Sequence, residues 1–220
     1  MSEVSVQEPA ASERIAAILR DEILSGKIPP GQRILQEEVA ERLGSSRLPV
    51  REAIRILDAD GLLEVETNKG ARVPHLDINQ VEVLYRMRER LEPLALIESM
   101  PALTEADFER LDEIQVRIEA GVDVQAFLEL DREFHLLTYS HCPTEQLRDS
   151  VTRLWNSTSH YRRAFMEITG ARRLWIVNAE HKLLLEALAR HDSQDAERYL
   201  VGHIQRTRKE LSQHPEIFTR

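Results

Sequence analysis

The sequence predicts a mainly α-helical protein of two parts, a small N-terminal unit with one short β-hairpin and a larger unit built only from helices. Aromatic residues make up 5% of the 220 residues, whereas the helix formers Leu, Ala, Glu and Arg are abundant. Apolar residues recur at helical spacing along most of the chain, and the only strand-like stretch lies at residues 62–74. The first ten residues are polar and are expected to form a flexible tail.

Composition and charge narrow the classes of protein that this chain can be. No stretch reaches the roughly 18 apolar residues of a membrane span, and no signal-like segment precedes the first expected helix. A single cysteine, Cys142, rules out an internal disulfide framework and favours a reducing cytoplasm. The net charge is −9, and Met1–His75 carries 10 basic and 13 acidic residues. Any nucleic-acid binding must therefore come from a local basic surface rather than from overall charge.

Three helices are expected in the N-terminal unit, residues 11–75. Ser12 and Ser46 are suited to cap the first and third helices, and the second is expected over Gln36–Leu43. Pro49 falls in the first turn of the third helix, where its missing N–H costs little. Two short helices joined by a tight turn are typical of a helix-turn-helix.

A β-hairpin is expected after the third helix. Its strands are predicted at Leu62–Glu66 and Ala71–Pro74, with the turn at Thr67–Gly70. Helix, turn, helix and hairpin in this order form a winged helix-turn-helix, which lays one helix in the DNA major groove. If the apolar face of the third helix is buried, its outer face presents Arg47, Arg51 and Arg55, and Arg42 on the approach to this helix adds to the local positive stripe.

The rest of the chain predicts an antiparallel bundle of six or seven helices. Residues 76–79 are expected to form a linker and residues 80–220 the bundle, because amphipathic segments follow one another with short connections and no strand pattern. The six helices that can be placed are Gln80–Ser99, Glu105–Ala120, Val124–Ser140, Glu145–Ile168, Arg172–Arg190 and Ala196–Ser212.

Four residues of this bundle indicate a divalent-metal site. Asp131 and His135 are four apart on one helix, so their side chains share a face. His181 and His203 each lie eleven residues from Asp192, where two helices are expected to turn back on each other at equal height. A single helical histidine is more often a packing or surface residue, but three imidazoles and a carboxylate at one level suit a metal. Zinc is the first choice, with nickel, manganese and iron as alternatives.

Two stretches resemble a known family. Residues Pro30–Val73 follow the pattern PG…L.E…A..LG.SR.PVREA…L...GLL......G..V, which resembles the DNA-binding half of the GntR family of bacterial transcriptional regulators. The remainder resembles the effector-binding FCD domain of the FadR branch of that family. The matching residues are Arg88-x-x-Leu91-Glu92, Asp131-x-x-Phe134-His135, Glu180-His181 and His203. The four proposed metal ligands match the metal-binding version of this domain.

For DNA, the resemblance implies a homodimer that reads a pseudo-palindromic double-stranded operator. Arg47 and Arg51 match the arginines that contact bases and phosphates, and Lys69 and Gly70 match the tip of the wing. One position departs from the family: Glu37 stands where the fatty-acid regulator has an arginine, so the operator need not match that of relatives. The residues expected to contact DNA are Arg33, Ser46, Arg47, Pro49, Arg51, Arg55, Lys69 and Gly70.

For the bundle, the expected function is to bind a small carboxylate-bearing metabolite with the help of the metal. Guanidinium groups pair well with carboxylates, so an acid-binding pocket is expected to use cations near the metal. The residues expected to bind the effector are Arg88, Asn156, Arg162 and Arg163. The sequence thus predicts a cytoplasmic, ligand-responsive regulator that acts as a repressor and is not an enzyme.

Two other functions remain open from the residues alone. Three histidines and one aspartate with open coordination positions also suit a metal-dependent enzyme. Against this function, no general base is evident beside the ligands and no nucleophile motif is present. A purely structural metal in a constitutive regulator is the other alternative.

Overall fold

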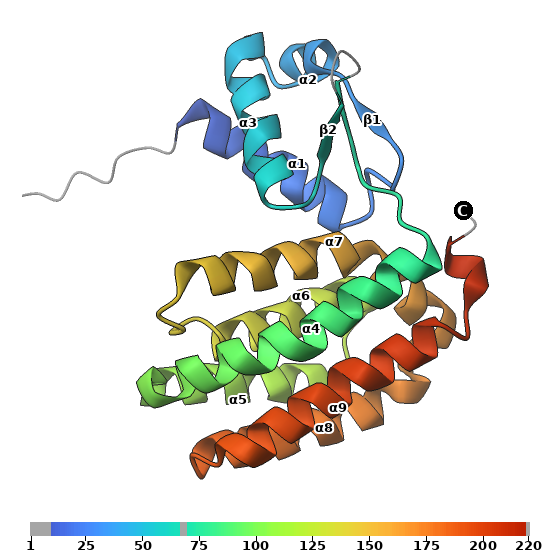
Figure 1. Cartoon of the computed structure of the whole chain (residues 1–220). Coiled ribbons are helices and arrows are strands. Elements are labelled where there is room, and N and C mark those ends of the chain that lie inside the picture. Colours follow the sequence, from blue (N-terminus) through green and yellow to red (C-terminus); the bar gives the residue numbers. More distant parts are fainter. Residues whose placement is uncertain (1–9, 67–69, 219–220) are drawn as a thin grey trace, which may run out of the picture. The chain divides into compact units, whose positions relative to one another are not determined.

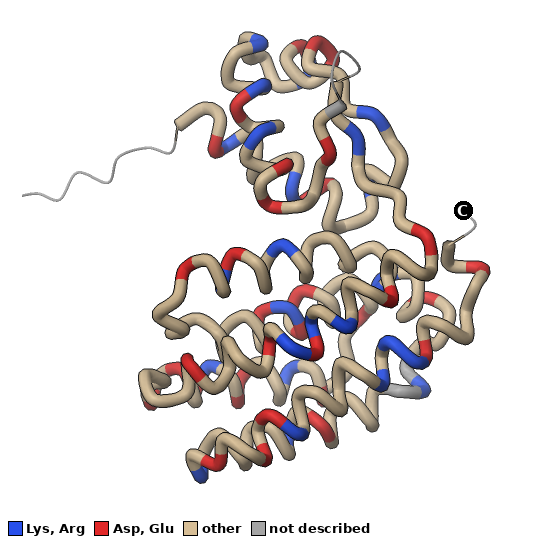
Figure 2. The backbone as a smooth tube through the Cα atoms, viewed as in Figure 1, with Lys and Arg blue, Asp and Glu red and all other residues tan. Residues whose placement is uncertain are grey.

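The computed structural model describes residues 10–66 and 70–218, and the chain divides into two units, Met1–His75 and Leu76–Arg220 (Figure 1). Each unit has its own apolar core. Figure 2 shows acidic and basic residues interspersed along both units. Among the described helices, none has the length and apolar character that crossing a membrane requires.

The N-terminal unit is a winged helix-turn-helix, as predicted. Its elements are α1 (Ala11–Leu24), β1 (Arg33–Ile34), α2 (Gln36–Arg42), α3 (Arg47–Ala59), β2 (Glu64–Glu66) and β3 (Gly70–Arg72). The three strands form an antiparallel sheet in the order β1-β3-β2. The strand β1 was not expected, because two residues are too short to show an alternating pattern. It pairs with β3 and so ties the wing to the segment before α2.

The core of this unit forms where α1 packs against α3. The buried face of α3 contains Val50, Ala53, Ile54 and Leu57, as its periodicity predicts. The first helix begins at Ala11, so Ser12 lies within its first turn and is not the N-cap as expected. The helix starts before Ser12 because the Glu13 carboxylate accepts a hydrogen bond from the backbone N–H of Ala10, which makes Ala10 the N-cap residue.

Two further details of the N-terminal unit differ from the sequence analysis. Ser46 is the N-cap residue of α3, but its side chain makes no capping hydrogen bond. Arg42 was expected to add to the positive charge near α3. Instead its guanidinium makes two bonds of 2.5 and 2.8 Å to the Glu22 carboxylate of α1. This arginine therefore joins α2 to α1.

The second unit contains the six expected helices. They are α4 (Ile78–Ser99), α5 (Glu105–Glu119), α6 (Val124–Thr138), α7 (Glu145–Thr169), α8 (Leu174–Ala189) and α9 (Ser193–Leu211). Three short 3₁₀ segments accompany them, η1 (Met100–Ala102), η2 (Gly170–Arg173) and η3 (Pro215–Phe218). The helix α4 packs against α7 and α9, and α5 packs against α6 and α8.

Capping residues set where these helices begin. The Asp77 carboxylate accepts a bond from the Gln80 N–H, and the Gln80 side chain accepts one from the Asp77 N–H, so α4 starts inside the range expected to be a linker. The Asp192 carboxylate accepts a bond from the Asp195 N–H and starts α9. Just before it, His191 has a positive φ of 54°. The α8–α9 turn at these residues makes the two helices antiparallel neighbours.

Candidate functional site

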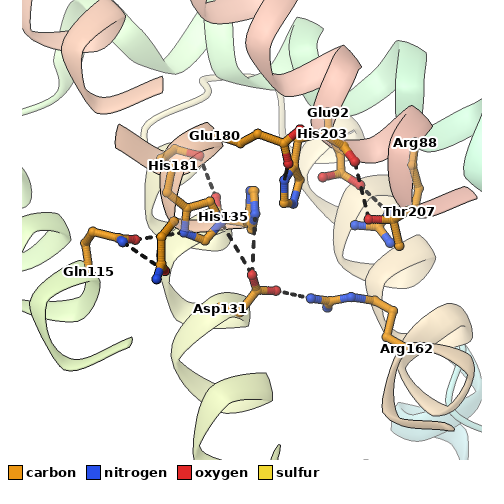
Figure 3. Close-up of polar contacts among 12 residues, drawn as sticks. Arg88, Glu92, Gln115, Asp131, His135, Arg162, Glu180, His181, His203 and Thr207 are labelled. Carbon is orange, nitrogen blue, oxygen red and sulfur yellow. Dashed lines mark hydrogen bonds and ion pairs between the residues drawn. The ribbon is translucent and has the colours of Figure 1, made fainter. Parts of the chain in front are cut away.

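The structure brings Asp131, His135, His181 and His203 together in the interior of the bundle (Figure 3). One potential ligand atom from each of the four lies within 4.8 Å of those from the others. Asp131, His135 and His181 are each 1% exposed, and His203 is partly buried. The spacing of these four residues in the sequence therefore predicted correctly that their side chains converge.

Three helices position this cluster. Asp131 and His135 are one turn apart on α6, while His181 comes from α8 and His203 from α9. The α8–α9 hairpin places the two histidine rings 5.3 Å apart. Phe134 of α6 stacks on the His181 ring at 4.2 Å and so restricts the rotation of that imidazole.

The His181 ring is oriented by a buried amide. The Gln115 Nε2 donates to Glu119 at 2.8 Å and to Asn178 at 3.2 Å. Both of its amide hydrogens are thus used, so its Oε1 serves as the acceptor for His181 Nδ1 at 2.9 Å. The proton of His181 is therefore on Nδ1, and the lone pair of Nε2 points to the cluster.

The other two histidines have similar partners on the outer side. His203 Nδ1 lies 2.9 Å from the Glu180 carboxylate, which also pairs with Arg206. His135 Nδ1 lies 3.4 Å from the Tyr139 hydroxyl. That hydroxyl donates to Glu92 at 2.8 Å, so its oxygen accepts from the imidazole. Carboxylate, carbonyl and hydroxyl partners of this kind hold metal-binding imidazoles in one orientation.

The inner nitrogens of these histidines are suited to bind a cation. Within the described residues, the buried Nε2 atoms of His135 and His181 have no hydrogen-bond partner. Burial, together with the charge of nearby His203, lowers the pKa of His135 and that of His181 well below the usual value. Both rings are therefore neutral at physiological pH, and neutral imidazole is the form that binds metals.

Asp131 completes the donor set. Its Oδ1 lies 3.5 Å from His181 Nε2 and 3.9 Å from His135 Nε2, while its Oδ2 accepts a bond from Arg162. Three imidazole nitrogens and one carboxylate oxygen form a set that zinc, nickel, manganese and iron all accept. We conclude that these residues fit a divalent transition metal and that the donors alone do not select among the candidates.

A cavity opens beside the cluster. It encloses about 470 Å³ of space that protein atoms do not fill, part of it open to solvent. Its polar lining is formed by Arg88, Asp131, Arg162, His203 and Thr207. The remaining lining is aromatic or aliphatic and consists of Tyr85, Phe127, Trp155, Phe165, Met166, Val177 and Ile204. A mostly apolar cavity with a few polar groups is typical of a small-molecule site.

Two arginines line this cavity, and each is paired with a carboxylate. Arg88 is 3% exposed and forms a buried ion pair with Glu92, and it also donates to Thr158 at 3.3 Å. Arg162 pairs with Asp131. Both guanidinium carbons lie over the Trp155 ring, at 4.4 Å for Arg88 and 4.2 Å for Arg162. Burial and the charge of Arg88 lower the pKa of Arg162 to about 10, so it stays charged at neutral pH.

The other two expected effector residues lie outside the lining of this cavity. Arg163 donates to Gln125, and the Asn156 carbonyl oxygen accepts a bond of 2.8 Å from Arg132. One residue along a helix turns the side chain by about 100°, which explains why Arg162 and its neighbour Arg163 face different surroundings.

Sequence reasoning missed several side chains of the site. Gln115 could have been noticed as an amide within the apolar stripe of α5, between Leu111 and Ile118. Thr207 is four residues after His203 and so shares its helix face. Trp155 gave no signal, since a buried tryptophan is ordinarily a core residue.

The expected DNA-contacting residues lie mostly on the surface of the N-terminal unit. Arg33, Ser46, Arg47, Arg51 and Arg55 are exposed, and Pro49 is half-buried. Gly70 has a positive φ of 85°, which favours glycine at the base of the wing. Lys69 lies outside the described residues.

A winged helix-turn-helix with exposed arginines on α3, joined to a helical domain that has a mostly apolar cavity beside a buried polar cluster, is the arrangement of a DNA-binding transcriptional regulator. The comparisons with known proteins agree. The model of the bacterial regulatory proteins of the gntR family matches residues 11–73, and the FCD domain matches residues 83–206. The chain therefore belongs to the GntR family and carries an FCD domain.

Its relatives include regulators from several bacteria. The HTH-type regulator YdhC of Bacillus subtilis is 28% identical over 192 residues, which cover 84% of each chain. The HTH-type repressor RspR of Escherichia coli is 24% identical over 205 residues, covering 92% of this chain and 89% of RspR. The solved structure of E. coli McbR/YncC is 26% identical, with a TM-score of 0.80 over 94% of this chain and 99% of that one.

Proposed function

We propose that this regulator is a homodimeric repressor whose affinity for a pseudo-palindromic operator changes when a small carboxylate binds beside a divalent metal in the FCD domain. The observation that carries the proposal is the buried cluster of three histidines and Asp131, which borders a cavity that also contains Arg88 and Arg162. Repression is supported by the relative RspR, which is named a repressor. A dimer is supported by the two-fold symmetry that such operators share with their readers.

The metal would be held by Asp131, His135, His181 and His203. When bound, it would supply a Lewis acid to which a carboxylate oxygen can coordinate. The chain itself supplies charge and orientation. Arg162 can pair with an incoming carboxylate through its guanidinium, while the aromatic and aliphatic lining excludes water from that contact and strengthens it.

Regulation requires more than tight binding. The acid must bind one arrangement of the dimer more strongly than another, because equal affinity for both would leave operator binding unchanged. A coupling of about 1–3 kcal/mol, which is typical of allosteric proteins, would change operator affinity about 5- to 150-fold. We therefore expect a shift of this size when the correct acid is added.

The test uses full-length, metal-loaded protein, operator DNA selected from a random library, and a panel of mono- and dicarboxylic acids. We expect at least one acid to change the affinity for the operator in wild-type protein. The same acid should have no effect on Asp131→Ala or His203→Ala protein that still folds by circular dichroism. If either variant responds like wild type, the cluster has no part in sensing.

A further inference from the structure

An acidic side chain lies within the proposed DNA-reading surface. Glu37 is in the first turn of α2, and Arg47 is the first residue of α3. The Glu37 carboxylate lies 2.8 Å from the Arg47 guanidinium. Their side chains are 71% and 70% exposed, so both also face solvent. The packing of α2 against α3 thus places an acceptor beside the arginine that starts the recognition helix.

This ion pair contributes little to the stability of the fold. Exposed pairs are worth about 0–1 kcal/mol, since both groups remain hydrated. Packing holds the two helices instead, through the buried residues Val39, Ala40 and Val50. The pair is therefore free to be replaced by contacts with DNA at small cost, and its effect on DNA binding outweighs its effect on folding.

The neighbouring arginines of α3 also have acidic partners. Glu52 lies 3.7 Å from Arg51 and 3.3 Å from Arg55. Each arginine on the outer face of α3 thus has a carboxylate nearby. DNA phosphates repel carboxylates that lie close to them, so a surface of this kind binds random DNA weakly. Specific binding then depends on base contacts that satisfy both the arginines and the carboxylates.

We propose that Glu37 is a specificity-determining residue that reads one G·C base pair together with Arg47. In the major groove, guanine offers the acceptors O6 and N7, and its cytosine offers the N4 amino donor. Arg47 would donate to the guanine, and Glu37 would accept from the cytosine amino group. The Arg47–Glu37 ion pair presents donors and an acceptor side by side, and this arrangement complements the major-groove edge of a G·C base pair. The inference rests on the family's DNA-binding function and on α3 as the reading helix.

Glu38 provides a matched control. It is exposed on the same helix as Glu37, and within the described residues it forms no ion pair. Glu37→Gln and Glu38→Gln therefore change the net charge equally, but only Glu37→Gln exchanges the carboxylate next to Arg47 for a neutral amide, which accepts more weakly and adds a donor that the cytosine amino group cannot satisfy. Effects of bulk charge will appear in both variants, and effects on base reading only in the first.

The experiment selects binding sites from a random duplex library with full-length wild type and each variant. Affinities for the selected site, its single base-pair substitutions and an unselected duplex are then measured at one salt concentration. We expect Glu38→Gln to select the wild-type site. We expect Glu37→Gln to lose the preference for one G·C pair in each half-site, with discrimination there falling about tenfold. Both variants should bind the unselected duplex more tightly by a similar factor.

Three results would overturn the proposal. They are an unchanged preference at every position in Glu37→Gln, a uniform loss of affinity for all sequences in that variant, and the absence of any selected site for wild type. A double-mutant cycle with Arg47→Ala adds an independent readout. The effects of Glu37→Gln and Arg47→Ala should be non-additive on the selected site and additive on the unselected duplex. Additivity on both would also contradict the joint reading of one base pair.

Discussion

Single residues outside the metal cluster determine whether its imidazoles are ready to bind. Gln115 is the clearest case, because its two amide hydrogens are taken by Glu119 and Asn178 and its oxygen must face His181. A side chain that never touches the metal thus fixes which nitrogen of His181 carries the proton. The apolar surroundings keep the proton on that nitrogen, because an unpaired polar group in the core destabilises the fold.

We predict that Gln115→Leu weakens metal binding about 10- to 100-fold, as loss of an outer partner of a ligating histidine usually does. Without the acceptor, the His181 ring loses its fixed tautomer and orientation. Gln115→Glu combined with Glu119→Gln keeps an acceptor oxygen for His181 and exchanges donor and acceptor between positions 115 and 119, so this double variant should restore most of the affinity. Competition with a metal-binding dye measures the metal dissociation constant of each variant. Equal metal affinity in Gln115→Leu and wild type would show that this hydrogen bond does not prepare the site.

Two adjacent arginines on α7 allow a direct test of the cavity. We predict that Arg162→Met weakens binding of the responsive acid about 10- to 150-fold, because a hydrogen bond to a charged group is worth roughly 1.5–3 kcal/mol. Arg163→Met removes the same charge from the next residue, whose side chain contacts Gln125 instead. Calorimetric titration of the metal-loaded proteins with the acid gives the dissociation constant of the acid for each variant. Equal losses in the two variants would mean that overall charge, and not the Arg162 contact, attracts the acid.

At the scale of elements, the spacing of residues along the sequence predicted more of the candidate metal site than the chemistry of single side chains did. The separation of Asp131 and His135 on one helix, and the equal distance of His181 and His203 from Asp192, were enough to predict the cluster. The contribution of Gln115 could not be predicted in this way, because it depends on how α5 packs against α8. The unexpected roles of Arg42 and β1 likewise arise from pairing between elements distant in sequence.

At the same scale, the ion pair between Glu22 of α1 and Arg42 of α2 makes the stability of the N-terminal unit depend on pH. The hydrogen bonds of Arg42, with help from Lys27, lower the pKa of Glu22 to about 2 despite its burial. Since this folded-state pKa lies below the ordinary glutamate value of 4.5, the stabilisation is present above about pH 4.5 and is lost as the pH falls towards 2. Because the Arg42 and Lys27 side chains are 42% and 67% exposed, solvent screening reduces the contribution of this shift to roughly 1–3 kcal/mol.

We predict that Glu22→Gln destabilises the N-terminal unit at pH 7 by roughly 1–3 kcal/mol and removes this part of its acid sensitivity. Hydrogen exchange of the α1 and α2 amides measures the local stability of the unit. Glu38→Gln, which makes the same charge change on α2, is the control and should have little effect. An unchanged exchange rate in Glu22→Gln at pH 7 would contradict the role given to this ion pair.

At the scale of the whole molecule, the metal should stabilise one unit and not the other. The proposed ligands lie on α6, α8 and α9, and a metal that binds only the folded state raises the stability of the unit that contains it. We predict that chelation lowers the unfolding temperature of the helical unit, followed by the fluorescence of buried Trp155 and exposed Trp175. Hydrogen exchange in the N-terminal unit should not change. Equal destabilisation of both units would argue against a metal confined to this cluster.

The central claim is that an acid bound in the helical unit and an operator bound by the N-terminal unit influence each other. Such coupling is reciprocal, so the factor by which the acid changes operator affinity must equal the factor by which the operator changes acid affinity. The most direct test measures both with metal-loaded, full-length protein and the acid that emerges from the carboxylate panel. We predict equal factors of about 5 to 150 for wild type and no acid-dependent change of operator affinity for Asp131→Ala. Acid binding that leaves operator affinity unchanged in wild type would contradict the account.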